Sequence, residues 1–134
     1  MTREELLTSG EANYMNDAHL VFFKALLQSQ LQECNERVSS GLKALSALEK
    51  PVDDVDQASV EEERQKMLRM LDRDRMNLPK LRKAMERIDD RSFGYCEESG
   101  EPIGIKRLLA RPAATLCIEA KQRQELREKH LRVA

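Results

Sequence analysis

The chain has little of the material from which large aromatic cores, disulfide frameworks and membrane spans are built. Its 134 residues include no tryptophan, two tyrosines, three phenylalanines and three cysteines. So small and odd a number of cysteines excludes a disulfide framework, and no apolar run approaches the ~18 residues that a membrane span needs. The N-terminal segment is acidic and has no apolar signal core, so we expect a cytoplasmic protein without membrane association.

Charged residues are abundant instead, at 35% of the chain, with a net charge of −1. The balance hides a segregation, since 49–63 holds seven acids and one base whereas 64–87 holds nine bases and three acids. A balanced total gives no net attraction to nucleic acid, so we expect no direct sequence-specific DNA binding. The high charged fraction favours helices with solvated faces over a sandwich or barrel, and predicts a mainly α fold.

Two heptad repeats predict two long helices. Apolar residues recur in alternating steps of four and three from Leu27 to Leu48, and a second repeat of this kind runs from Val60 to Ile88. This alternation is the a/d seam of a coiled coil. Pro79 lies inside the second repeat, where we expect a kink or a loosened turn.

The segment between the repeats predicts a fold-back into an antiparallel coiled-coil hairpin over 33–88, with its tip at 51–58. Pro51 cannot continue a helix interior because it lacks an N–H donor. A fold-back at this tip places Cys34 level with Asp74. The hairpin is then a stiff arm of ~33 Å that ends on acids. Such an extended arm can reach into a partner but forms no catalytic cleft, so we expect no enzymatic activity and no catalytic residue.

The remaining segments, 1–32 and 89–134, predict a small globular end. The apolar spacing within 11–31 suits an amphipathic helix, and 116–131 suits a final helix. Short apolar runs on both sides of 97–100 suggest a small β-hairpin. Because a two-stranded hairpin alone is marginally stable, it must pack on the terminal helices.

A degenerate metal site lies in this end. Cys96 and Ser99 are spaced like one knuckle of a zinc ribbon, and Cys117 and Ala120 like the other. Structural zinc takes four thiolate or imidazole ligands, and neither the hydroxyl nor the methyl group supplies one. We therefore expect no metal here, with both cysteines acting as small buried hydrophobes. A Cys96–Cys117 disulfide is possible geometrically, but a reducing compartment disfavours it.

Two segments of this end resemble the DksA/TraR family. They are RSFGYCEESGEPIGIKRL at 91–108 and ARPAATLCI at 110–118. Asp53, Asp56 and Ala58 resemble the D-x-x-D-x-A tip motif of that family. The resemblance extends over nearly the whole chain. The loss of cysteine at two of the four zinc positions is similar to the loss in the zinc-independent members of the family. It implies a transcription regulator that binds bacterial RNA polymerase at the beta' rim and inserts its tip into the secondary channel.

The resemblance further implies a regulator of initiation that represses ribosomal RNA promoters in the stringent response together with the alarmone ppGpp, with no resident cofactor. We expect a monomer. In the family, part of a ppGpp site lies against the polymerase rim, and guanidinium groups suit its phosphates. This chain departs from the family at Met76, Asn77 and Pro79. The positions of this chain that match the ppGpp-binding residues of the family are all basic: Arg73, Lys80, Arg107, Arg111 and Lys121.

Two alternatives stay open. A transcript-cleavage factor would share the hairpin and use tip acids to hold Mg²⁺, but it would need a β-rich partner domain that the sequence does not show. A coiled-coil chaperone or scaffold would need exposed apolar residues at the tip, and Asp53 and Asp56 argue against it. The simplest interpretation of the acids is that they complement a helix dipole, and of the bases that they form a solvated face.

Overall fold

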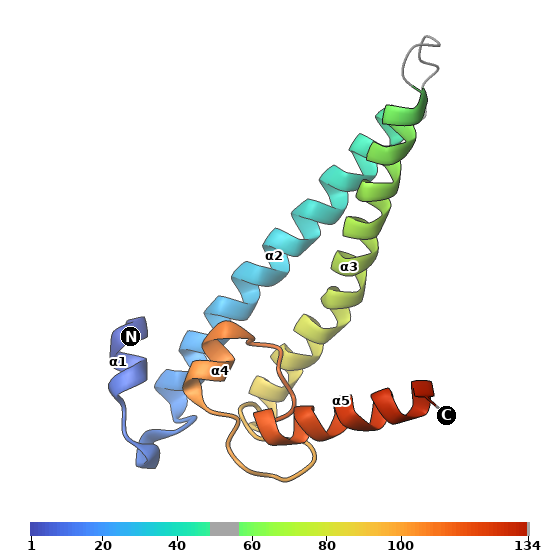
Figure 1. Ribbon diagram of the computed structural model, residues 1–134. Coiled ribbons are helices and arrows are strands. Elements are labelled where there is room, and N and C mark those ends of the chain that lie inside the picture. Colours follow the sequence, from blue (N-terminus) through green and yellow to red (C-terminus); the bar gives the residue numbers. More distant parts are fainter. Residues whose placement is uncertain (49–56, 134) are drawn as a thin grey trace. The chain divides into compact units, whose positions relative to one another are not determined.

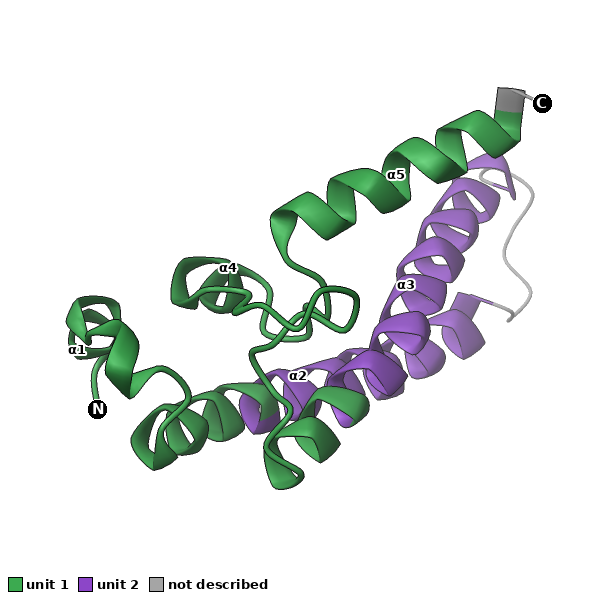
Figure 2. Ribbon diagram, turned by 90° about the horizontal axis from the view of Figure 1, so that it is seen from below, with its two compact units in different colours: residues 1–27, 83–134 green, residues 28–82 purple. Residues whose placement is uncertain are grey.

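The computed structural model describes residues 1–48 and 57–133, and two long helices dominate it (Figure 1). These are α2 (Asp17–Leu48) and α3 (Gln57–Asp89). The chain separates into two compact units, unit 1 with residues 1–27 and 83–134 and unit 2 with residues 28–82 (Figure 2). No helix in the described ranges is long and apolar enough to cross a membrane. The short elements all belong to unit 1: α1 (Arg3–Thr8), the 3₁₀ helix η1 (Glu11–Asn13), α4 (Ile105–Ala110) and α5 (Ile118–Val133).

Unit 2 is the predicted antiparallel hairpin, in which α2 and α3 pack side by side (Figures 1 and 2). The Cys34 thiol donates a hydrogen bond to the backbone oxygen of Asp74 at 3.4 Å, so these residues are level, as the heptad register predicts. A Cβ atom at Gly41 would lie 2.9 Å from the Leu71 side chain. The glycine therefore lets the two helices approach closely at the weakest seam position. The predicted fold, mainly helical with a coiled-coil hairpin, is confirmed.

The seam of α3 is buried at most of its positions from Leu71 onwards and is more open towards the start of the helix. Leu71, Asp74 and Leu81 are buried, whereas Arg64 at an equivalent position is exposed and lies 3.6 Å from Glu61 on the same helix. The helix also continues through Pro79. A proline removes one helical hydrogen bond, and buried residues on either side of it hold the helix in register, so the predicted disturbance does not end α3.

Unit 1 is built around two phenylalanines from distant parts of the sequence. The rings of Phe23 and Phe93 have centroids 5.3 Å apart, and both side chains are buried. Leu6 in α1 and Leu108 in α4 are fully buried, and α1 contacts α4. The N-terminal helices and the segment after α3 therefore share one apolar core.

The predicted β-hairpin around 97–100 is reduced to a single antiparallel bridge between Tyr95 and Pro102, so the described residues contain no strand. The Ile103 N–H donates to the Gly94 carbonyl at 2.8 Å. Pro102 has no N–H with which to extend the ladder, and α4 begins two residues after Ile103. The second apolar run is thus too short for a strand.

The first long helix begins later than the apolar spacing of 11–31 suggests. Met15 adopts a positive φ of 54°, which turns the chain just before α2. The Asn16 side chain caps the helix, because its Oδ1 accepts a hydrogen bond from the His19 N–H at 2.9 Å. The turn therefore separates η1 from α2.

His19 joins α1, this turn and α2. Its Nδ1 accepts a hydrogen bond from the Met15 N–H at 3.1 Å, so Nε2 carries the proton and donates to Ser9 Oγ at 2.9 Å. Burial lowers the pKa of His19 because the charged ring would lose its hydration. The neutral imidazole is thus the form that fits this site.

Candidate functional sites

The predicted tip, 51–58, lies mostly outside the described residues. Asp53 and Asp56 both fall in 49–56, so their placement is not described. Ala58 is exposed in the first turn of α3. Of the three motif residues, one is therefore located on the surface at the start of α3.

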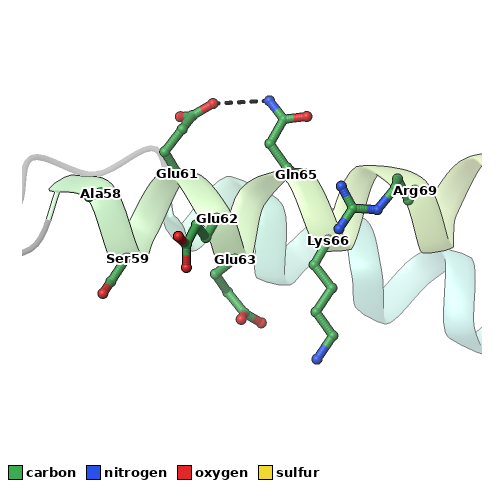
Figure 3. Close-up of a pocket in the computed structure, with 8 residues that line it drawn as sticks. All are labelled: Ala58, Ser59, Glu61, Glu62, Glu63, Gln65, Lys66 and Arg69. Carbon is green, nitrogen blue, oxygen red and sulfur yellow. Dashed lines mark hydrogen bonds between the residues drawn. The ribbon is translucent and has the colours of Figure 1, made fainter.

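A surface hollow of about 820 Å³ lies next to Ala58 (Figure 3). All of its lining residues come from α3, so the hollow lies along one exposed helix. Among them the Gln65 side chain donates to Glu61 at 3.0 Å. Ligand pockets are usually concave sites with convergent polar groups, and one exposed helix face does not offer that. The lining residues are Ala58, Ser59, Glu61, Glu62, Glu63, Gln65, Lys66 and Arg69.

A second hollow, which we call the unit 2 groove, holds two of the predicted ppGpp residues. It measures about 470 Å³ and contains both Arg73 and Lys80. These residues are seven positions apart on α3 and therefore share one helix face. The complete lining is Arg37, Arg73, Asp74, Met76, Asn77 and Lys80.

The other three predicted ppGpp residues lie in unit 1. Arg107 in α4 donates its Nε–H to the Leu116 carbonyl at 3.0 Å, so part of its guanidinium group is used to hold the chain. Arg111 is exposed at the end of α4, and Lys121 in α5 donates to Gln124 at 3.1 Å. That all five residues form one site stays a prediction.

The four positions of the degenerate metal site do not supply a zinc ligand set. Cys96 and Cys117 are buried free thiols, and the Ser99 hydroxyl lies 4.0 Å from the Cys117 sulfur. Ala120 is fully buried and offers a methyl group. Across 1–48 and 57–133, no cluster of three or more His, Cys, Asp or Glu side chains could hold a metal ion. Two thiols, a hydroxyl and a methyl group do not fit the four-ligand site that structural zinc needs.

The surroundings of the Cys96 thiol lower its pKa. Burial raises the pKa of Cys96, but the Ser99 hydroxyl and the backbone N–H groups of Cys117, Ser99 and Glu98 outweigh burial and lower the pKa to about 6. Because this pKa lies below that of an unfolded cysteine, the thiolate stabilises the fold at high pH. That contribution is lost as the pH falls through about 6.

Arg87 anchors the loop that follows α3, a role that no pattern in the sequence indicates. It is one of the three buried polar or charged residues among the described ones. Its Nη2 donates to the carbonyls of Ser92 at 3.1 Å and Tyr95 at 2.7 Å, and its Nη1 lies 3.8 Å from Glu97. Charge-assisted bonds of this kind are stronger than neutral ones, so Arg87 fixes both ends of the turn into the bridge.

Tyr14 holds the other side of the same region. Its hydroxyl donates to the Gly94 carbonyl at 2.6 Å and accepts from the Gly104 N–H at 2.9 Å. Burial raises its pKa, so the phenol stays protonated and can donate. Gly94 has a φ of 90°, and a Cβ there would lie 2.7 Å from Met15, so glycine is required. Side chains therefore hold the backbone of this loop in place.

Two family models match this chain. Residues 19–88 match the N-terminal domain of the DnaK suppressor protein DksA, and residues 91–126 match the prokaryotic dksA/traR C4-type zinc finger. The second match covers a segment in which two of the four cysteine positions are Ser99 and Ala120.

Individual proteins agree with the family models. The RNA polymerase-binding transcription factor DksA of Caulobacter vibrioides is 43% identical over 125 residues, which cover 90% of this chain and 86% of the relative. The protein of the same name from Escherichia coli K12 is 40% identical, over a match that covers 88% of this chain and 79% of the length of that protein. The solved structure of transcription factor DksA2 from Pseudomonas aeruginosa is 49% identical, with a TM-score of 0.85 over 96% of this chain and all of that one. These names describe transcription factors, in agreement with the prediction that this chain is not an enzyme.

Proposed function

We propose that this chain, which belongs to the DksA/TraR family, binds bacterial RNA polymerase and regulates the initiation of transcription. The observation that carries the proposal is the antiparallel hairpin of unit 2, in a chain 40–43% identical over most of its length to proteins named as polymerase-binding transcription factors. As a partner of RNA polymerase, the chain acts in the cytoplasm and as a monomer.

The proposed mechanism is mechanical and electrostatic. The hairpin enters the secondary channel past the beta' rim and carries Asp53, Asp56 and Ala58 towards the active centre of the polymerase. Like charges at one tip repel one another, and a basic or metal-bearing target offsets that repulsion. Contacts there alter the stability of the open complex, and repress ribosomal RNA promoters in particular.

We propose that ppGpp strengthens this repression in the stringent response. The unit 2 groove supports the proposal, since it brings Arg73 and Lys80 onto one face of α3. Arg107, Arg111 and Lys121 are the further ppGpp residues of unit 1. Met76 lines the groove with an exposed apolar side chain and adds no charge.

We further propose that the chain acts without zinc. The support is the donor set, in which Ser99 and Ala120 take two of the four ligand positions and Arg87 and Tyr14 hold the surrounding loop. None of the proposed phosphate-binding or tip residues is one of the four ligand positions, so the proposed activity needs no metal-bound group there.

Elemental analysis of the purified chain is expected to find well under one zinc per molecule. Incubation with a chelator is expected to leave the helical circular dichroism and the melting temperature unchanged, because no ligand set closes around a metal. Zinc at one equivalent, or unfolding in the chelator, would show that Ser99 and Ala120 do not disable the site.

Transcription from a ribosomal RNA promoter tests the proposed function. With RNA polymerase, the wild-type chain is expected to repress this promoter, and ppGpp to deepen the repression. Arg73→Ala removes charge-assisted hydrogen bonds to phosphate, so about tenfold more ppGpp is needed, while repression without ppGpp stays at the wild-type level. A chain that neither binds polymerase nor changes promoter output would contradict the proposal.

A further inference from the structure

We propose that Arg37 is a further phosphate-binding residue of the unit 2 groove, held in its binding orientation by the buried carboxylate of Asp74. This inference rests on the proposed binding of ppGpp. It assigns to α2 a contact with the phosphates, in addition to those from α3. The residue lies outside the D-x-x-D-x-A motif and is not itself one of the heptad seam residues.

The charge of the groove favours an anionic ligand. Three bases line it, Arg37, Arg73 and Lys80, against the single acid Asp74. The remaining lining residues, Met76 and Asn77, are uncharged. This excess of positive charge, in a hollow of about 470 Å³, suits the phosphate groups of a nucleotide polyphosphate.

Arg37 is restrained at one edge of its guanidinium group. Its Nε–H points to both oxygens of Asp74, at 3.3 Å to Oδ1 and 3.4 Å to Oδ2. In the described part of the chain, both hydrogen bonds of Arg37 use Nε, which leaves the two Nη groups for a ligand. The side chain of Arg37 is 51% exposed whereas that of Asp74 is 10% exposed. The Nε–H therefore contacts a buried carboxylate, while about half of the Arg37 side chain stays accessible to a ligand.

Asp74 is itself held in place. It lies in the seam of the hairpin, where the Cys34 thiol donates to its backbone oxygen. A buried carboxylate is costly unless it is paired, so the structure favours a state in which Arg37 stays beside it. Pairing also neutralises the acid, which would otherwise repel a phosphate in the same groove.

This arrangement prepares Arg37 for binding. A guanidinium group offers a planar fork that matches two phosphate oxygens, and a side chain that is already oriented loses less entropy when the ligand arrives. The simpler role, neutralising Asp74 alone, needs only Nε. It predicts a loss of stability without any specific loss of ligand affinity.

The test measures binding of labelled ppGpp to RNA polymerase with and without the full-length chain. Arg37→Ala is expected to weaken the chain-dependent binding about tenfold, while affinity for polymerase without ppGpp stays at the wild-type level. Arg37→Lys keeps the charge beside Asp74 and lacks the fork. It is expected to restore the melting temperature but not the ppGpp affinity. Arg75→Ala, which removes an exposed arginine of α3 outside the groove, is the matched control and is expected to bind ppGpp normally.

Two results would overturn the inference. If Arg73→Ala weakens chain-dependent binding but Arg37→Ala and Arg37→Lys bind as the wild type does, Arg37 only neutralises Asp74, and the proposed function stands. If the wild-type chain adds no ppGpp binding to that of polymerase alone, the ppGpp part of the proposed function fails and the role of Arg37 fails with it.

Discussion

Asp56→Asn is expected to abolish repression of a ribosomal RNA promoter while the chain still binds RNA polymerase. Asparagine matches aspartate in shape, so the change removes a charge and leaves the length of the hairpin unaltered. A charge-assisted hydrogen bond is worth roughly 1.5–3 kcal/mol, or about 10- to 100-fold in an equilibrium. Run-off transcription measures the repression, and a pull-down with core polymerase measures the binding.

Asp54→Asn is the matched control, because it removes the same charge from the same segment outside the D-x-x-D-x-A motif. Its repression is expected to remain near the wild-type level. If both variants lose repression equally, the total charge of the tip acts and not the motif. Full repression by Asp56→Asn would refute the assignment of the tip.

Arg87→Ala is expected to lower the free energy of unfolding of unit 1 by about 3 kcal/mol. The substitution removes two charge-assisted hydrogen bonds, to the carbonyls of Ser92 and Tyr95, and bonds of this kind are worth about 1.5–3 kcal/mol each. The contact with the half-exposed Glu97 adds little. Urea unfolding followed by tyrosine fluorescence measures the loss, because both tyrosines of the chain, Tyr14 and Tyr95, lie in unit 1.

Arg91→Ala serves as the control for this substitution. Arg91 pairs with Asp17 at 2.8 Å, but their side chains are 70% and 81% exposed. Surface pairs of this kind contribute about 0–1 kcal/mol, so the urea midpoint is expected to move little. An equal loss in the two arginine variants would show that Arg87 is not the anchor of the loop.

The hairpin of unit 2 follows from local pattern alone. A repeat of four and three steps specifies which faces of two helices meet, and a proline-containing break specifies that they meet antiparallel. The level pairing of Cys34 with Asp74 was therefore predictable to the residue. The incomplete set of ligand types at the four positions was equally accessible, since it depends only on residue type and spacing; that the chain acts without zinc stays a prediction.

Contacts between distant residues were not accessible in this way. Tyr14 meets Gly94 and Gly104 across 80 and 90 residues, and no periodicity links them. Arg37 resembles any other exposed base of a coiled coil until the buried carboxylate opposite it is known. The β-hairpin was overpredicted for the opposite reason, because its apolar runs were evident while the early start of α4 was not.

The burial of Ala120 next to the positions of two free cysteines has an evolutionary consequence. Cysteine differs from serine by one atom exchanged and from alanine by one atom added, so Ser99→Cys and Ala120→Cys alone would restore four thiols. Arg87 and Tyr14 contact the main chain and not the thiols, so these two anchors do not use the side chains at positions 99 and 120. Two substitutions therefore separate the present donor set from the four thiols of a C4-type finger.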